Sequence, residues 1–93
     1  MTVRKYVLRY TPEAKNKIAH LPPPLKQTLR TSLEQLQLNP WLGKPLQRDL
    51  TGFRSLRVGS HRVIYQIDED HRHIHVLTLG ARKTIYEDLK KRH

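Results

Sequence analysis

Polar and apolar residues alternate in the first ten positions of the chain and then adopt a helical period. Within residues 3–10, apolar and aromatic side chains take one face of an extended chain and mostly charged ones the other: Tyr6, Leu8 and Tyr10 against Lys5, Val7 and Arg9. This alternation predicts a half-buried strand. Thr11-Pro12-Glu13 then supplies a capping hydroxyl, a proline for the first helical position and an early acid. A helix is therefore predicted to begin there.

Two helices are predicted before residue 39. The first carries apolar residues on one face and ends at the prolines that open the second, Pro22-Pro23-Pro24. The second repeats leucine at helical spacing until Asn39-Pro40 stops it: Leu25, Leu29, Leu33 and Leu36. Because the joint is short, the two helices are predicted to form an antiparallel hairpin.

The second half of the chain shows the shorter period of strands. Residues 41–52 have turn residues without a sustained period and are expected to form a loop. Three short strands follow, separated by turns at Gly59-Ser60 and at residues 68–71, and such tight joints predict an antiparallel meander. Thr84 to Arg92 can form a final helix. The predicted fold is a single α+β domain over residues 1–93: an N-terminal strand, a helical hairpin, a three-stranded meander and a short C-terminal helix.

Composition narrows the partners of this domain. The 93 residues include 18 Lys and Arg against 8 Asp and Glu, a formal charge of +10, which favours polyanionic partners such as RNA, DNA or an acidic protein segment. No apolar run is long enough to span a bilayer, and the N-terminal segment has no signal-peptide pattern. Without cysteine there is neither a disulfide framework nor a thiolate zinc site, so we expect a cytoplasmic protein.

Three arginines and a tyrosine are the candidates for chemistry. Arg57 and Arg62 flank a tight turn, so they should lie on neighbouring strands, and Arg82 follows the next strand after Gly80. Guanidinium groups bind phosphate bidentately and keep their charge, so converging arginines suit the transition state of phosphoryl transfer. Tyr86 lies four residues after Arg82, and its phenol can move a proton or its ring can stack on a base.

Simpler interpretations compete with these. Arginines on an exposed sheet edge also prevent aggregation, and composition alone favours that role over catalysis. His71, His73 and His75 alternate beside a turn, but the sequence offers no third ligand of obvious spacing beside His73 and His75. We therefore expect a solvated or packed role for them, no metal site and no cofactor.

Four short motifs carry a family resemblance. In chain order they are Gly43-Lys44-Pro45-Leu46, Leu56-Arg57-Val58-Gly59, Arg62-Val63-Ile64-Tyr65 and Leu79-Gly80-x-Arg82 with Tyr86. Together with the order of elements they resemble the RelE toxins of the RelE/ParE superfamily, ribonuclease components of type II toxin–antitoxin pairs, over nearly the whole chain. The resemblance implies a RelE-like fold related to microbial ribonucleases and metal-independent cleavage of mRNA on the ribosome, by attack of a 2'-hydroxyl on the adjacent phosphate. It also implies inhibition by an acidic RelB-like antitoxin, and operator DNA bound indirectly through the toxin–antitoxin complex.

The resemblance also implies roles for individual residues. Arg62 matches the strand arginine that such toxins use on the scissile phosphate, and Arg82 matches the second phosphate-binding arginine. Tyr86 matches the tyrosine assigned to stacking or proton transfer, so these three residues are the expected catalytic set. Arg57 matches a basic strand position nearby and is expected to bind RNA phosphate.

The sequence departs from the family at Ser55, where members often carry lysine or arginine. The usual general base is therefore missing, and Lys44 and Arg48 from the preceding loop are the candidates to fill its place or to bind RNA phosphate. Arg54 is a further candidate for phosphate binding, although strand alternation directs it to the other face unless a bulge turns it inward.

Two other functions stay open. The ParE branch of the same superfamily inhibits DNA gyrase by binding, without cutting RNA, and an inert basic nucleic-acid-binding module would also explain the charge. The presence of Arg62, Arg82 and Tyr86 together favours the nuclease.

Overall fold

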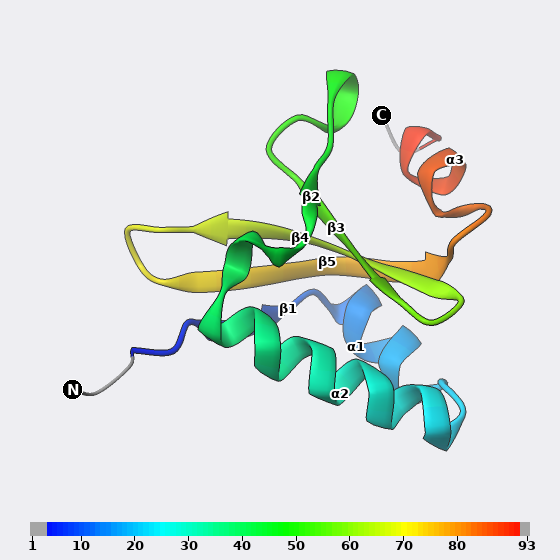
Figure 1. Cartoon of the computed structure of the whole chain (residues 1–93). Helices are drawn as coiled ribbons and strands as arrows, with labels where there is room; N and C mark the ends of the chain where they lie inside the picture. Colours follow the sequence, from blue (N-terminus) through cyan, green and yellow to red (C-terminus); the bar gives the residue numbers. More distant parts are fainter. Residues whose placement is uncertain (1–3, 92–93) are drawn as a thin grey trace.

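The computed structural model describes residues 4–91 and contains one five-stranded sheet with three helices (Figure 1). The strands lie in the spatial order β1-β5-β4-β3-β2. Their bounds are β1 Val7–Tyr10, β2 Lys44–Pro45, β3 Arg54–Val58, β4 His61–Asp68 and β5 His73–Ala81. The helices are α1 Pro12–Ala19, α2 Pro23–Leu38 and α3 Ile85–Lys90.

The three C-terminal strands form the predicted antiparallel meander, since β3 pairs with β4 and β4 with β5. The N-terminal strand completes the sheet from the far side, because β1 pairs in parallel with β5, with Val7 opposite His73. β1 begins at Val7, later than the predicted start at residue 3, which lies outside the described residues. The α+β prediction is thereby confirmed, with two more strand pairings than the sequence pattern indicated.

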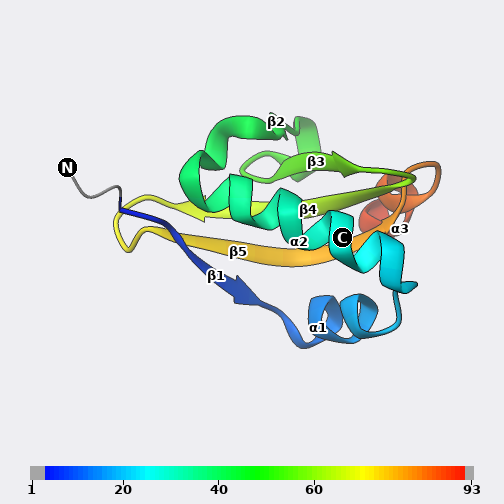
Figure 2. The ribbon, with the colours of Figure 1, turned by 60° about the horizontal axis from the view of Figure 1, so that its bottom comes forward.

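The helical hairpin begins and ends at the predicted signals. The Thr11 hydroxyl accepts a hydrogen bond from the Ala14 amide at 3.0 Å, and Pro12 opens α1, as expected for an N-cap followed by a first-turn proline. α2 begins at Pro23 and stops before Asn39. It lies over one face of the sheet and runs back past α1 (Figure 2).

Apolar side chains pack on both faces of the sheet. On the helical-hairpin face, leucines of α2 meet alternate residues of the strands: Leu29, Leu33, Leu36, Val58, Val63, Tyr65, Ile74 and Val76. On the opposite face, Ile85 and Leu89 of α3 form a smaller cluster with Leu50 and Ile64. Because α3 has only six residues, it covers one end of that face, near the β3–β4 turn, and leaves the other end open (Figure 1).

The segment expected to be a loop, residues 41–52, contains β2 and two short 3₁₀ turns, Pro40–Leu42 and Arg48–Leu50. Glycine at position 43 lets this segment pack closely on the sheet. A Cβ there would lie 2.5 Å from the Tyr65 hydroxyl oxygen and 2.8 Å from the Ser55 carbonyl oxygen. The fully buried Tyr65 hydroxyl donates to the Pro40 carbonyl at 2.7 Å and accepts from the Gly43 amide at 2.9 Å. These hydrogen bonds satisfy a buried polar group and tie residues 40–43, which lead into β2, to β4.

Among residues 4–91, no helix is long and apolar enough to cross a membrane.

Candidate functional site

Arg57, Arg62 and Gly80 form one row across three strands. Arg57 lies opposite Arg62 in the β3–β4 ladder, and Arg62 lies opposite Gly80 in the β4–β5 ladder. The two-residue turn at Gly59-Ser60 brings the arginines together, and Gly59 has a φ of 59°, a conformation that glycine adopts without strain. Directly opposite residues in a ladder point to the same face, so both guanidinium groups belong to the α3 side of the sheet.

Ser55 joins Arg62 to Tyr86. Arg62 Nη1 donates to the Ser55 hydroxyl oxygen at 3.2 Å, and the Tyr86 hydroxyl donates to the same oxygen at 3.1 Å. The Arg62 guanidinium carbon also lies 5.9 Å from the centre of the Tyr86 ring, within the range of a cation–π contact. Ser55 is only 2% exposed, so this hydroxyl is a fixed point that orients both functional side chains. We call these three residues the Ser55 cluster.

Gly80 lets α3 bring Tyr86 to the sheet. A Cβ on Gly80 would lie 2.8 Å from Cδ1 of the buried Ile85, the first residue of α3. The absence of a side chain at Gly80 thus leaves room for α3 itself. Since Tyr86 follows Ile85 directly, the packing of Ile85 against Gly80 sets the position of the tyrosine ring.

Arg82 lies just beyond the end of β5, next to the β3–β4 turn. Its amide donates to the Ser60 carbonyl at 2.9 Å, which ties the chain after β5 to the β3–β4 turn. The side chains of Arg82 and Arg57 are exposed, with Arg57 Nε donating only to the Gly59 carbonyl at 3.4 Å. Within residues 4–91, none of these arginines forms an ion pair with a carboxylate, so their charge is available to an anionic ligand.

Lys44 and Arg48 approach the Ser55 cluster from the segment before β3. Lys44 lies opposite Ser55 in the β2–β3 ladder and is exposed, so it shares the face of the Ser55 cluster. Arg48 lines a groove of about 410 Å³ together with Asp49, Tyr86 and Lys90. The structure thus brings both residues to the same side of the sheet as the catalytic candidates.

Arg54 is not brought to this cluster. Its guanidinium donates to the carbonyl oxygens of Trp41 and Gly43 on the opposite face and lies 5.2 Å from the centre of the Trp41 ring. Strand alternation already predicted this direction, and in the structure the Arg54 side chain holds residues 41–43. Conversely, from the sequence Ser55 was considered only as the position of a missing base, and its hydroxyl was overlooked as a hydrogen-bond acceptor for Arg62 and Tyr86. Its spacing of two residues from Arg57 could have indicated this role, because residues at that spacing in a strand lie on the same face.

Comparison with known proteins identifies the family of this chain. A family described as "ParE toxin of type II toxin-antitoxin system, parDE" matches residues 4–86. Toxin RelG of Mycobacterium tuberculosis is 35% identical over 83 residues, which are 87% of this chain and 95% of RelG. The chain belongs to the RelE/ParE superfamily. It is therefore a toxin of the type II toxin–antitoxin class, and the predicted resemblance is confirmed.

Solved structures of related proteins share the toxin's fold. The toxin–antitoxin complex RelBE2 of M. tuberculosis matches with a TM-score of 0.78 and 31% identity, covering 87% of this chain and 95% of that chain. The isolated E. coli RelE toxin matches with a TM-score of 0.72 at 19% identity, covering 94% of this chain and 97% of that chain. At the lower identity the likeness concerns the fold alone.

Proposed function

We propose that this toxin is an endoribonuclease that cuts mRNA on the ribosome without a metal ion. The observation that carries the proposal is the convergence of Arg62 and Tyr86 on the buried Ser55 hydroxyl, with the exposed Arg57 opposite Arg62 and the exposed Arg82 beside the β3–β4 turn. A scissile phosphate placed over these residues would meet several permanent positive charges and one phenol. That set suits the cleavage of a phosphodiester better than simple retention of RNA.

The proposed reaction is a transesterification within the RNA. The 2'-oxygen attacks the neighbouring phosphorus while the bond to the 5'-oxygen breaks, giving a 2',3'-cyclic phosphate and a free 5'-hydroxyl. Arg62 and Arg82 stabilise the negative charge that develops on the phosphate oxygens in the transition state. Tyr86 supplies a proton to the leaving 5'-oxygen, and the amine of Lys44 accepts the proton of the 2'-hydroxyl.

Lys44 is preferred over Arg48 as the proton acceptor for a chemical reason. A guanidinium does not lose its proton in proteins, whereas a lysine amine can. Lys44 also lies directly opposite Ser55, the position at which the family's usual basic residue is replaced. The variant Lys44→Arg keeps the charge but removes the acceptor, so it should cut as slowly as Lys44→Ala. If Lys44→Arg instead cuts at the wild-type rate, Lys44 only binds phosphate.

A cognate antitoxin of the acidic RelB type is the proposed partner. The net charge of +10 and the exposed arginines of the site favour a negatively charged segment that wraps the toxin and folds on binding. Solved relatives of this fold include toxin–antitoxin complexes. Binding of operator DNA would then occur through the antitoxin in the complex.

The decisive experiment combines expression with mapping of RNA ends. Induced toxin should arrest translation, and primer extension should show cuts within ribosome-bound mRNA. Arg62→Ala should slow cutting roughly a hundredfold, because one transition-state charge contributes about 3 kcal/mol. The matched control is Arg30→Ala, which removes an exposed charge from α2 on the other face. Equal cutting by both variants would remove Arg62 from the site.

Inhibition of DNA gyrase is the second candidate function, because the matching family is described by its ParE toxins. Purified toxin would then block supercoiling by gyrase and leave ribosome-bound mRNA intact. A supercoiling assay run beside the primer-extension assay separates the two functions.

A further inference from the structure

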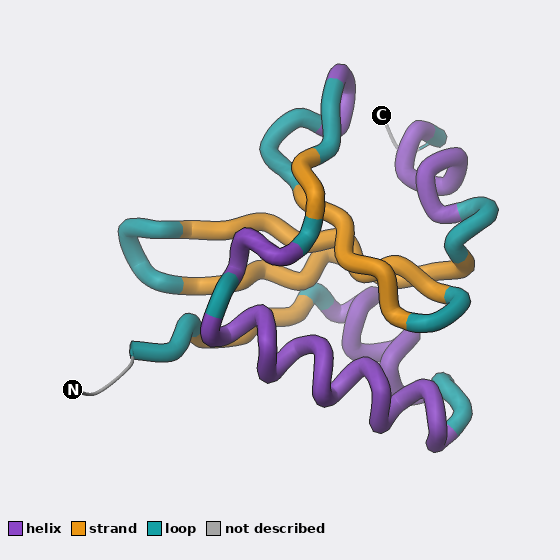
Figure 3. The backbone as a smooth tube through the Cα atoms, viewed as in Figure 1, coloured by secondary structure: helices purple, strands orange, loops and turns teal. Residues whose placement is uncertain are grey.

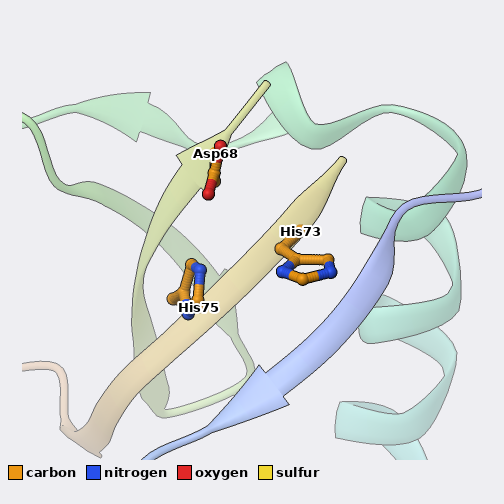
Figure 4. A group of neighbouring side chains, drawn as sticks. All are labelled: Asp68, His73 and His75. Atoms are coloured by element: carbon orange, nitrogen blue, oxygen red, sulfur yellow. The ribbon is translucent and has the colours of Figure 1, made fainter. Parts of the chain in front are cut away.

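A second cluster of polar side chains lies at the opposite end of β4 and β5 from the Ser55 cluster. Asp68 closes β4 and lies opposite His73 in the ladder, and His75 lies two residues further along β5. One potential ligand atom from each of these side chains lies within 4.8 Å of the others (Figure 4). α3 covers the other end of these strands, so this end is uncovered on that face (Figure 3).

The sheet explains why these three residues meet. His73 and His75 are separated by one residue on a strand, so they point to the same face. That face is not the helical-hairpin face, because the intervening Ile74 packs in the core on the hairpin side. Asp68 joins them only through the pairing of β4 with β5. The third ligand that the sequence lacked is therefore supplied across the ladder.

His71 brings a third imidazole, and so a fourth potential ligand, to the same place. Its Nδ1 lies 2.8 Å from Asp68 Oδ2, and its backbone amide donates to Asp68 Oδ1 at 3.2 Å. The rings of His71 and His73 have centres 5.9 Å apart, and those of His73 and His75 5.7 Å apart. Three imidazoles thus line up beside one carboxylate that the turn holds in place.

We propose that Asp68, His73 and His75 form a binding site for a divalent transition-metal ion of the zinc type, with His71 beside it as a fourth ligand. Imidazole nitrogen and carboxylate oxygen are ligands that Zn²⁺ accepts in tetrahedral sites. With bonds of about 2.0–2.1 Å, ligand atoms in such a site lie roughly 3.3 Å apart. The ligand atoms must therefore close by up to about 1.5 Å, which rotation of the exposed His75 and the half-buried Asp68 and His73 permits.

Local charge supports a cation here in spite of the basic chain. Residues 68–70 supply three of the eight acidic residues, Asp68, Glu69 and Asp70, and with His75 they line a hollow of about 430 Å³. Two cations oppose these carboxylates: Arg9 lies opposite His75 with its side chain exposed to solvent, and Arg72 lies between His71 and His73. The Arg72 guanidinium is turned to the Tyr6 ring and the Arg4 carbonyl. The three carboxylates therefore outnumber these two cations.

Bound metal would link β4 to β5 at the end that no helix covers. A ligand that binds only the folded state raises its stability by mass action. The metal would stabilise the long hairpin without contacting Arg62 or Tyr86, which lie at the other end of the strands. Its effect would be on thermal stability rather than on the chemistry at the phosphate.

The test is a titration of tag-free, full-length toxin with ZnCl₂ by isothermal calorimetry, with a thermal melt of each variant. Wild type should bind one ion and melt at a higher temperature with zinc than without. His75→Gln, His73→Gln and Asp68→Asn should each weaken binding by about tenfold or more, since even loss of an outer-shell partner costs that much. The matched control is His20→Gln, an exposed histidine at the end of α1, which should bind like wild type.

Either of two results would overturn the proposal: no saturable binding by wild type, or equal binding by wild type and His75→Gln. His75 is exposed, so His75→Gln should melt like wild type in the absence of zinc. That comparison separates loss of a ligand from loss of the fold. If His73→Gln alone unfolds, His75→Gln and Asp68→Asn still decide the outcome.

Discussion

Replacing Ser55 by alanine tests how the catalytic side chains are held. The Ser55 hydroxyl accepts from Arg62 at 3.2 Å and from Tyr86 at 3.1 Å. Alanine fills the same space without an acceptor, so both donors lose their partner at once. Neither donor is fully buried, and each can turn toward water after the change.

The expected losses follow from these contacts. A hydrogen bond contributes about 0.5–1.5 kcal/mol net to stability, and partly exposed donors recover some of it from water. Ser55→Ala should therefore lower the free energy of unfolding by about 1–2 kcal/mol. Cutting should slow by roughly tenfold to a hundredfold, because a misplacement of about 1 Å at a reacting group has effects of that size.

A double-mutant cycle measures whether Ser55 acts through the tyrosine. Urea unfolding of Ser55→Ala, Tyr86→Phe and the double variant should give a coupling of about 1 kcal/mol, since both single changes remove the same hydrogen bond. Ser32→Ala in the middle of α2 is the matched control and should leave stability and cutting near wild type, because alanine favours helix. Additive losses together with wild-type cutting by Ser55→Ala would refute the reasoning.

Three further predictions concern the segment around β2. Gly43→Ala should cost about 1–3 kcal/mol of stability in thermal unfolding, since its Cβ would meet the Tyr65 hydroxyl and the Ser55 carbonyl; unchanged stability would contradict that close approach. Arg54→Ala should shift the fluorescence of Trp41, the single tryptophan, and lower stability while folded molecules cut at the wild-type rate; slower cutting by folded molecules would return Arg54 to the site. Burial raises the pKa of Tyr65 above its ordinary 10.0, so its contribution to stability is complete below pH 10.0 and is lost as pH rises through the folded-state pKa. Urea midpoints measured from pH 8 to about 11 should fall at the alkaline end, and less steeply in Tyr65→Phe.

The helices and the meander were predictable because their signals lie in residues that are neighbours in sequence. Thr11 and Pro12 fix the start of α1, and Gly59 with Ser60 fixes the β3–β4 turn. Alternation along β3 was enough to send Arg54 away from the site. The bounds of single elements and the face to which each side chain points were therefore predictable.

Pairings between distant segments were not predictable. β1 pairs with β5 across more than sixty residues of sequence, and the sequence of neither strand indicates which strand it pairs with. The same limit hid Asp68 as a neighbour of His73, and Ser55 as the acceptor for Tyr86. Each of these contacts depends on which strands or helices lie side by side. The spacing of apolar residues within one element does not indicate its neighbours in space.

The parallel pairing of β1 with β5 has a consequence for the order of synthesis. Residues 7–10 are made before the other strands but have no partner until residues 73–76 follow. Tyr86 comes later still, on α3. A chain that stops before β5 lacks a complete sheet, and one that stops between β5 and Tyr86 still lacks the phenol. Under the proposed activity, the ribosome that makes the toxin is therefore not exposed to it until the chain has been extended beyond Tyr86.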